Sequence, residues 1–218
     1  EKATVLKAFQ QIQTYKSTVP NIFYYNALCV ISDGIDAKAS SVSAPFSRYL
    51  PWKAPKHNES EAKTELQILT EYMLDKKTLV ELIRNCTVFE SEEIKDQKTG
   101  LIFQTKVKKV AAYHQYYAVQ KAVAQTIRAT HNTDGDRKAG VVWHTQGSGK
   151  SLTMVFYSGQ IITHPLMENP TIVMLTDRND LDDQLFGTFG NCVGLLRQKP
   201  IQAENREHIK ELLKVSGG

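Results

Sequence analysis

A glycine-rich stretch near the middle of the chain, Gly147-Ser148-Gly149-Lys150-Ser151, has the residue types and the order that bind nucleotide phosphates. In a tight turn before a helix, glycines let phosphates approach the backbone N–H groups, and the helix N-terminus adds the positive end of its dipole. Lys150 would reach the β- and γ-phosphates and stabilise charge on the transferred group, while the Ser151 hydroxyl would bind Mg²⁺. The stretch therefore predicts a site for ATP and Mg²⁺, with Lys150 as its catalytic residue.

One position departs from the usual pattern G-x-x-x-x-G-K-[ST], because His144 stands where the first glycine is expected. That position starts the turn, whereas Gly147 and Gly149 make the closest approach to the phosphates. We therefore expect the His144 side chain to point away from the ligand and to pack beside the loop. A glycine-rich turn that merely precedes a helix is the alternative. The other loop residues predicted to bind ATP are Thr145, Gln146 and Ser148.

The elements on either side of the loop favour the nucleotide site. An apolar strand is predicted at 140–143, a helix carrying Val155 and Phe156 follows the loop, and a second apolar strand is predicted at 170–177. Strand, helix and strand at this spacing predict a βαβ unit in a parallel sheet with a right-handed crossover. Asp177 ends the second strand too early in the chain to be the magnesium-binding aspartate of a Walker B strand, which we expect outside this sequence.

The other elements are predicted from hydrophobic periodicity and turn residues. Before residue 100 they are a helix over 1–17, a buried strand over 22–32, a turn at Asp33-Gly34, a weaker strand before Pro45, two helices across 60–88 and a polar connector over 91–100. After it, they are a helix over 111–130 and an exposed loop over 131–140.

The composition fits a globular protein with one large or two small domains, since the 218 residues are 41% hydrophobic and 23% charged. The net charge of +4 permits a polyanionic partner without arguing for one. The three cysteines form no CxxC pair, so they indicate neither a disulfide framework nor a zinc site, and a reducing cytoplasm fits them. No apolar run reaches the roughly 18 residues of a membrane span. Because the sequence starts with Glu1-Lys2 and not with Met, we interpret it as a piece of a longer polypeptide.

The stretches "GDRKAGVVWHTQGSGKSLTMVFY" and "IVMLTDRNDLDDQLFGTF" resemble the restriction (R) subunit of type I restriction-modification enzymes. Those subunits are superfamily 2 DNA translocases that hold ATP between two RecA-like domains. Their phosphate loop has the form His-Thr-x-Gly-Ser-Gly-Lys-Ser, so that His144 points to this family. Thr-Asp-Arg-x-Asp-Leu-Asp-x-Gln is similar to their next helicase motif. The resemblance of these paired motifs covers the C-terminal half of the chain.

Two earlier stretches gain a meaning from this resemblance. "AYHQYYAVQKAV" is similar to the family's adenine-reading element, which implies that Gln115 hydrogen-bonds adenine and that Tyr113 stacks on it; without the family, the stretch is an ordinary helix start. "QQIQTYKSTVPNIFYYNALCVISDG" resembles the end of the family's PD-(D/E)xK nuclease domain. There Gln11 and Tyr15 match a Q-x-x-x-Y element that would position DNA or support the nuclease centre, and their spacing places both on one helix face. The nuclease metal ligands are expected before residue 1, and Asp33 is expected to serve a turn.

Two charged groups complete the list of candidates. Five lysines form a loose basic run that either contacts DNA phosphates or, in the interpretation we favour, is a solvated face: Lys95, Lys98, Lys106, Lys108 and Lys109. The second group is acidic and argues against phosphate contact by its loop: Asp177, Asp180, Asp182 and Asp183. Arg178, the one cation among them, is expected to form an intramolecular salt bridge.

These features predict an α/β chain in two parts. Residues 1–105 would be the C-terminal part of a PD-(D/E)xK nuclease-like domain, and residues 106–218 the N-terminal part of a RecA-like P-loop domain with a parallel sheet. The resemblance implies that the whole subunit hydrolyses ATP to translocate double-stranded DNA before cleaving it, in complex with modification and specificity subunits and in the cytoplasm, away from membranes.

Two alternatives remain open. One is a superfamily 2 translocase or helicase without nuclease activity. The other is a fragment that binds nucleotide, or only docks a partner, and is inactive on its own. Because Walker B and arginine-finger elements are missing from the sequence, we expect negligible ATP turnover from these 218 residues alone.

Overall fold

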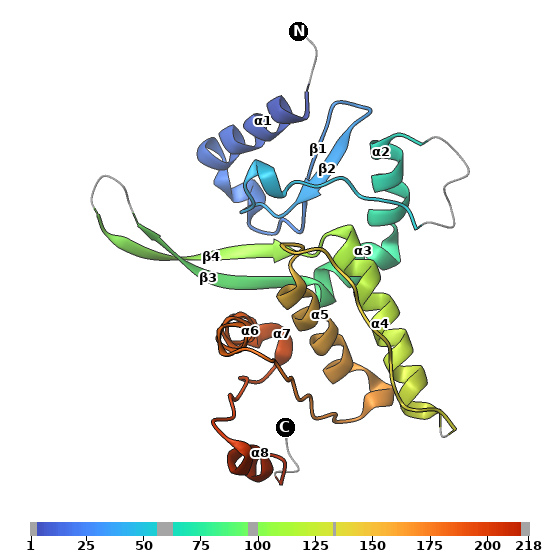
Figure 1. Ribbon diagram of the computed structural model, residues 1–218. Helices are drawn as coiled ribbons and strands as arrows, with labels where there is room; N and C mark the ends of the chain where they lie inside the picture. Colours follow the sequence, from blue (N-terminus) through green and yellow to red (C-terminus); the bar gives the residue numbers. More distant parts are fainter. Residues whose placement is uncertain (1–3, 56–62, 96–99, 133, 215–218) are drawn as a thin grey trace. The chain divides into compact units, whose positions relative to one another are not determined.

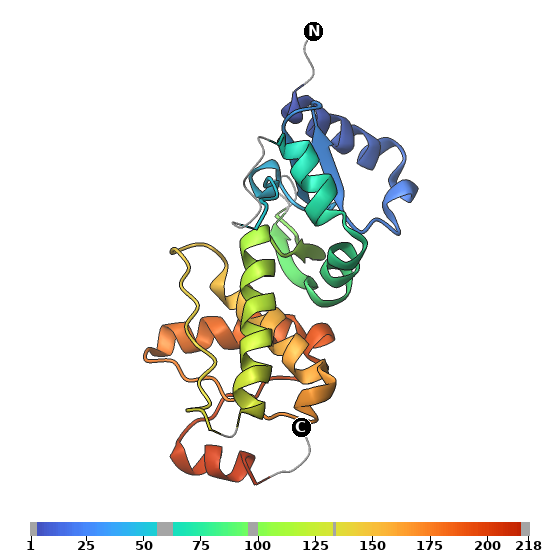
Figure 2. The same ribbon diagram turned by 90° about the vertical axis from the view of Figure 1, so that its right-hand side faces the viewer.

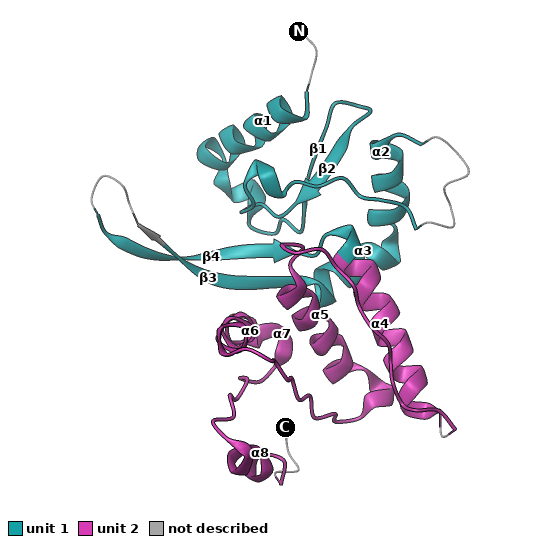
Figure 3. Cartoon of the chain, viewed as in Figure 1, with its two compact units in different colours: residues 1–114 teal, residues 115–218 magenta. Residues whose placement is uncertain are grey.

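The structure is a computed structural model that describes residues 4–55, 63–95, 100–132 and 134–214 (Figure 1). Contacts within the chain divide it into two compact units, residues 1–114 and 115–218 (Figure 3). The strands of the described residues form two separate two-stranded sheets, and both sheets are antiparallel. The boundary expected after residue 105 falls inside strand β4 (Ile102–Val110), which belongs to the first unit.

The first unit opens with helix α1 (Val5–Thr18), which the periodicity predicted. Its N-terminus is capped by Thr4, whose side chain accepts a hydrogen bond from the Lys7 N–H. One face of α1 packs against a core formed by Cys29, Ile31 and Tyr49, with Phe9 in edge contact with the Tyr49 ring at 5.3 Å between centroids. The other residues of α1 that pack on this core are Val5, Ala8 and Ile12.

Strands β1 (Cys29–Ser32) and β2 (Ala37–Ser40) form an antiparallel hairpin. The Asp33 carboxylate accepts the N–H groups of Ile35 (3.1 Å) and Asp36 (3.0 Å), which confirms its role in the turn. These same bonds lower the pKa of Asp33. Gly34 takes a positive φ of 101° in this turn.

The strand predicted over 22–32 is wrong in its first half. The 3-10 helix η1 (Pro20–Phe23) begins at Pro20, whose ring fixes φ near the value that a helical turn needs. The Asn26 side chain then donates to the Leu28 carbonyl (2.8 Å), a local bond that competes with strand pairing. Regular pairing therefore starts only at Cys29.

The two helices predicted across 60–88 are confirmed. Helix α2 (Glu65–Ile68) begins with a capping box and continues into a π-helical turn, η4 (Leu69–Met73). Helix α3 (Lys76–Asn85) begins at Asp75, whose carboxylate accepts two backbone N–H groups. Apolar side chains from these helices, among them Leu69, Met73 and Leu82, are buried in the first unit.

Strands β3 (Thr87–Lys95) and β4 (Ile102–Val110) form the longest hairpin of the chain's described residues (Figure 1). The connector predicted over 91–100 is therefore wrong for Ser91–Lys95, while residues 96–99 lie outside the described residues. Charged pairs across the hairpin replace the apolar alternation by which a strand is normally recognised.

The second unit is helical in its described residues. Helix α4 (Tyr113–His131) lies beside helix α5 (Lys150–Thr163), and the Thr126 and Tyr157 hydroxyls meet at 2.7 Å (Figures 1 and 2). Helix α5 also packs closely on α7 (Val193–Leu196), since a Cβ at Gly159 would lie 2.9 Å from Leu195. The remaining described helices of the unit are the 3-10 helix η5 (Pro165–Met167), α6 (Asn179–Asn191) and α8 (Arg206–Leu212). Helix α4, predicted over 111–130, buries Tyr116, Val119 and Val123, and α5 buries Val155 and Phe156.

The strands predicted at 140–143 and 170–177 do not form in the described residues, and neither does a parallel sheet. Both segments are irregular, and their apolar side chains are exposed: Val141 by 90%, Trp143 by 89% and Leu175 by 88%. A parallel strand needs a neighbour for its backbone groups and cover on both faces. Within the described part of the chain, no strand pairs with either segment.

None of the described helices combines the length and the apolar character that crossing a bilayer requires.

Candidate nucleotide-binding site

The glycine-rich stretch forms a turn that leads directly into α5. Gly147 (φ +77°) and Gly149 (φ +79°) both take the left-handed conformation that a Cβ disfavours. Gly149 is the N-cap of α5, which begins without a side-chain cap, and Lys150 and Ser151 are its first two residues. The first N–H groups of a helix have no partner within the helix, so this end of α5 has the geometry of an anion site.

The Lys150 side chain folds back over the turn. Its ammonium donates to the backbone carbonyls of His144 (3.3 Å) and Thr145 (3.0 Å), and the Thr145 carbonyl also accepts the Ser148 N–H at 3.4 Å. A phosphate oxygen is a stronger acceptor for an ammonium than a neutral carbonyl, because both partners are then charged. The lysine is exposed and is held at the loop where a phosphate would bind.

Gln115 is buried beside the loop, although 34 residues separate it from Gly149 in the sequence. Its side-chain nitrogen donates to the Gly149 carbonyl at 3.1 Å. The same carbonyl accepts the N–H (3.0 Å) and the hydroxyl (3.2 Å) of Thr153, which is also buried. The structure thus brings Gln115, which the resemblance implies for adenine, close to the loop, and adds Thr153, whose spacing of four after Gly149 is the only sequence signal for it.

The remaining predicted ATP-binding residues lie on the same turn. Thr145 and Gln146 are exposed, whereas Ser148 and Ser151 are half-buried. The His144 side chain is half-buried as well, and its carbonyl accepts a hydrogen bond from the Lys150 ammonium. The loop therefore presents a mixture of backbone groups, hydroxyls and one ammonium.

Tyr113 has contacts of its own within the first unit. Its ring meets Trp52 edge to face at 6.5 Å, and the Lys53 ammonium lies 5.5 Å from its centroid. A small cavity of about 30 Å³ adjoins the Trp52 and Tyr113 side chains.

Gln11 and Tyr15 are both exposed on α1, away from the face that packs on the core. Tyr15 is 45% exposed, so its ring is accessible. Among the residues that the structure describes, no group of three or more His, Cys, Asp or Glu side chains is placed to hold a metal ion.

The expectation that all four aspartates lie in a loop is wrong, because Asp180, Asp182 and Asp183 are among the first residues of α6. Arg178 pairs with one of them, which confirms the expected salt bridge. The Arg178 guanidinium donates to both carboxylate oxygens of Asp180, at 3.1 and 2.5 Å, and this lowers the pKa of Asp180. The Gln202 amide donates to Asp182 (2.6 Å) and Asp183 (3.1 Å). The Gln202 bonds thus hold the start of α6 to the irregular segment near residue 202.

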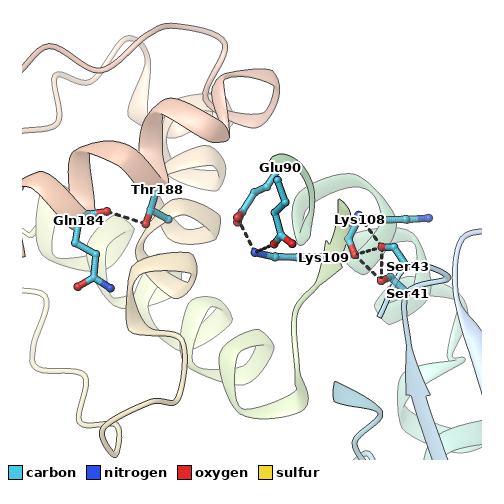
Figure 4. A network of polar contacts seen from close by, with 8 residues as sticks. Ser41, Ser43, Glu90, Lys108, Lys109, Gln184 and Thr188 are labelled. Atoms are coloured by element: carbon cyan, nitrogen blue, oxygen red, sulfur yellow. Dashed lines mark hydrogen bonds and ion pairs between the residues drawn. The ribbon is translucent and has the colours of Figure 1, made fainter. Parts of the chain in front are cut away.

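The lysine run is only in part the solvated face that we favoured. Lys106 is exposed, but the Lys108 ammonium donates to the carbonyls of Asn26 (2.6 Å) and Ala27 (2.7 Å), and desolvation lowers its pKa. Its backbone also bonds Ser43, and its carbonyl accepts the Ser41 hydroxyl (Figure 4).

The neighbouring Lys109 ammonium pairs with the carboxylates of Glu90 (2.6 Å) and Glu92 (3.0 Å), as Figure 4 shows for Glu90. Lys108 and Lys109 therefore hold the first unit together, and the interpretation as a solvated face is wrong for both. Lys98 lies outside the described residues, as does the side chain of Lys95.

Comparison with known proteins gives matches along the whole chain. The sequence profile of the SWI2/SNF2 ATPase family matches residues 114–218. The HindI type I restriction enzyme endonuclease subunit of Haemophilus influenzae is 45% identical over 98% of this chain and 20% of its own length. The MjaIXP endonuclease subunit of Methanocaldococcus jannaschii, provisionally assigned to the type I restriction enzymes, is 29% identical over 99% of this chain and 21% of its own length. No solved structure matches the chain.

The ATPase family match begins at the start of α4 and contains the whole candidate site, from Gln115 to Ser151. The chain spans about one fifth of the length of the relatives it matches. The resemblance drawn from the two helicase-like motifs is therefore confirmed. The chain is a relative of the endonuclease (R) subunits of type I restriction enzymes.

Proposed function

We propose that the chain binds MgATP at the turn 144–151, as part of the motor of a DNA-translocating restriction endonuclease subunit. The observation that carries this proposal is the geometry of the turn. Two left-handed glycines, Gly147 and Gly149, precede an uncapped helix whose first residue, Lys150, already reaches over the turn. A Cβ at Gly147 would meet no atom within 4 Å, so the backbone is open to a close ligand there.

Each residue of the turn has a distinct part in this proposal. The Lys150 ammonium leaves the carbonyls of His144 and Thr145 for the β- and γ-phosphates and stabilises charge on the transferred phosphoryl group. The N–H groups at the start of α5 donate to phosphate oxygens. The Ser151 hydroxyl, in the first turn of α5, holds Mg²⁺. The Gln115 side chain, beside the loop, contacts adenine.

For the whole polypeptide, we propose ATP-driven translocation of double-stranded DNA followed by cleavage, in a cytoplasmic complex with modification and specificity subunits. The relatives of this chain are endonuclease subunits, and the ATPase match covers its second half. The first unit would then be the end of a PD-(D/E)xK nuclease-like domain, and the exposed face of α1 with Gln11 and Tyr15 would support that domain's contact with DNA.

The ATP site is tested by Lys150→Ala in the full-length protein. We expect at least about 100-fold slower ATP hydrolysis, because a positioned cation on the transferred phosphoryl group is lost. Lys138→Ala is the matched control, since its side chain is 82% exposed, and it should hydrolyse ATP at the wild-type rate. Equal rates for wild type and Lys150→Ala would refute the site.

An assay of DNA cleavage distinguishes the proposed function from the alternative, a superfamily 2 translocase without nuclease activity. We expect the full-length protein, assembled with its partner subunits, to cut double-stranded DNA only when ATP is hydrolysed. Translocation without any cleavage would favour the alternative. The 218 residues alone are expected to show negligible ATP turnover, and Lys150-dependent turnover by this piece would contradict that expectation.

A further inference from the structure

Three donors converge on one backbone carbonyl at the start of α5. The Gly149 carbonyl accepts the Thr153 N–H, the Thr153 hydroxyl and the Gln115 side-chain nitrogen, all between 3.0 and 3.2 Å. The first of these bonds is the ordinary bond of a helical turn. The Gln115 bond is different, because it comes from another helix, α4, and from a side chain that is only 6% exposed.

The amide orientation of Gln115 follows from chemistry. A carbonyl oxygen can only accept, so the nitrogen of the side-chain amide, and not its oxygen, must face Gly149. The amide also lies against the α-carbon, since a Cβ at Gly149 would come within 2.7 Å of the Gln115 nitrogen. Gln115 therefore fixes the Gly149 carbonyl both by a hydrogen bond and by contact.

Fixing this carbonyl also fixes the N–H on the other side of the same peptide bond. A trans peptide is planar, and its C=O and N–H point in opposite directions. The peptide that carries the Gly149 carbonyl carries the Lys150 N–H. When the carbonyl is held toward Gln115 and Thr153, the Lys150 N–H must point the other way, out of the helix N-terminus, where an anion binds.

We infer that Gln115 is a positioning residue for the phosphate loop: by holding the Gly149 carbonyl, it aims the Lys150 backbone N–H at the nucleotide phosphates. This inference rests on the proposed nucleotide site. It gives Gln115 a role that does not depend on the base, in addition to any contact with adenine. The side-chain nitrogen has two hydrogens, and the bond to Gly149 uses one of them.

The test compares three ligands that share phosphates and differ in the base. Binding of MgATP, MgGTP and inorganic tripolyphosphate is measured by calorimetry with the full-length protein and with Gln115→Ala. Loss of one hydrogen bond at the loop predicts a weakening of about 3- to 10-fold for MgGTP and tripolyphosphate, and at least the same factor for MgATP, which also loses the proposed contact of Gln115 with adenine. Gln125→Ala, an exposed glutamine on the same helix, should leave all three affinities unchanged.

Two results would overturn the inference. Weaker binding of MgATP alone would show that Gln115 reads only the base, and unchanged binding of all three ligands would show that the bond to Gly149 has no effect. Failure of the nucleotide site itself gives a different result. In that case the wild-type protein and Lys150→Ala would bind each ligand equally, whatever stands at 115.

Two further variants distinguish a loss of overall structure from the loss of the bond that positions the phosphate loop. Gln115→Met keeps approximately the length of the side chain but has no group that can donate to a carbonyl, so it should weaken tripolyphosphate binding at least as much as Gln115→Ala while the circular dichroism spectrum stays unchanged. If Gln115→Met binds tripolyphosphate like wild type, the inference fails.

Thr153→Val removes the hydroxyl that shares the carbonyl with Gln115. A carbonyl has two lone pairs, so the remaining donors partly compensate for the loss of one. The double variant should then weaken binding by more than the product of the two single effects. If the double variant weakens binding only by the product of the two single factors, the two donors act independently and the shared-carbonyl mechanism is refuted.

Discussion

Replacing Gly149 with alanine measures how tightly the phosphate loop is packed. Both Gly147 and Gly149 have a left-handed φ, which costs an alanine about 1–2 kcal/mol. At Gly147 the new Cβ meets nothing within 4 Å, so the backbone penalty is the whole effect. At Gly149 the Cβ would lie 2.7 Å from the buried Gln115 nitrogen, which must move and lose its hydrogen bond, at a further cost of about 1–3 kcal/mol.

These penalties lower the fraction of protein whose loop can bind phosphate, and the measured dissociation constant rises in proportion. Gly147→Ala should weaken ATP binding about 5- to 30-fold, and Gly149→Ala about 5- to 140-fold more than that. In a Gln115→Ala background the contact is absent, so the two alanine substitutions should then cost the same. The assay is calorimetric titration of ATP into the full-length variants. Equal effects of the two substitutions in the wild-type background would refute the reasoning.

Two further predictions concern the first unit. Lys109→Met leaves the Glu90 carboxylate, whose side chain is 11% exposed, without its ammonium and should lower the free energy of unfolding in urea by about 1–2 kcal/mol. Lys77→Met, whose side chain is 84% exposed and lies 4.0 Å from Glu81, should change it by less than about 0.5 kcal/mol, and equal losses would contradict the argument. Burial raises the pKa of the Cys29 thiol above its ordinary value of 9.0, so the unfolded chain ionises there before the folded protein does. The contribution of Cys29 to stability should be complete below pH 9 and decline as the pH rises further, seen as a falling urea midpoint relative to Cys29→Ala; a rising difference would contradict it.

Local signals in the sequence were sufficient for several helices, α1 and α5 among them, and for the turn of the site. Helix α1 has its apolar face at helical spacing behind a Thr cap, and α5 follows the glycines that its phosphate loop requires. Asp33 and Gly34 form a turn through bonds to residues two and three positions away. In each case the interactions that decide the conformation lie within a few residues, so the pattern carries them.

Features that depend on distant partners were not predictable in the same way. The β3–β4 hairpin is held by pairs such as Ser91 with Lys106, and its charged residues hide the alternation of a strand. The apolar segments at 140–143 and 170–177 have strand composition, but composition supplies no neighbour to pair with. The hydrogen bond from Gln115 to Gly149 joins two helices, and neither local sequence predicts it.

The hydrogen bonds of the Lys108 side chain have a consequence for the order in which the first unit can be completed during synthesis. Its ammonium binds carbonyls at Asn26 and Ala27, which precede it by 82 and 81 residues. At a synthesis rate of about 5–20 residues per second, those carbonyls leave the ribosome about 4–16 s before their partner does. The residues that form the aromatic contacts around Tyr49 are therefore made before β4. The first unit can therefore become complete only after β4 has been made, whatever the order in which its helices form.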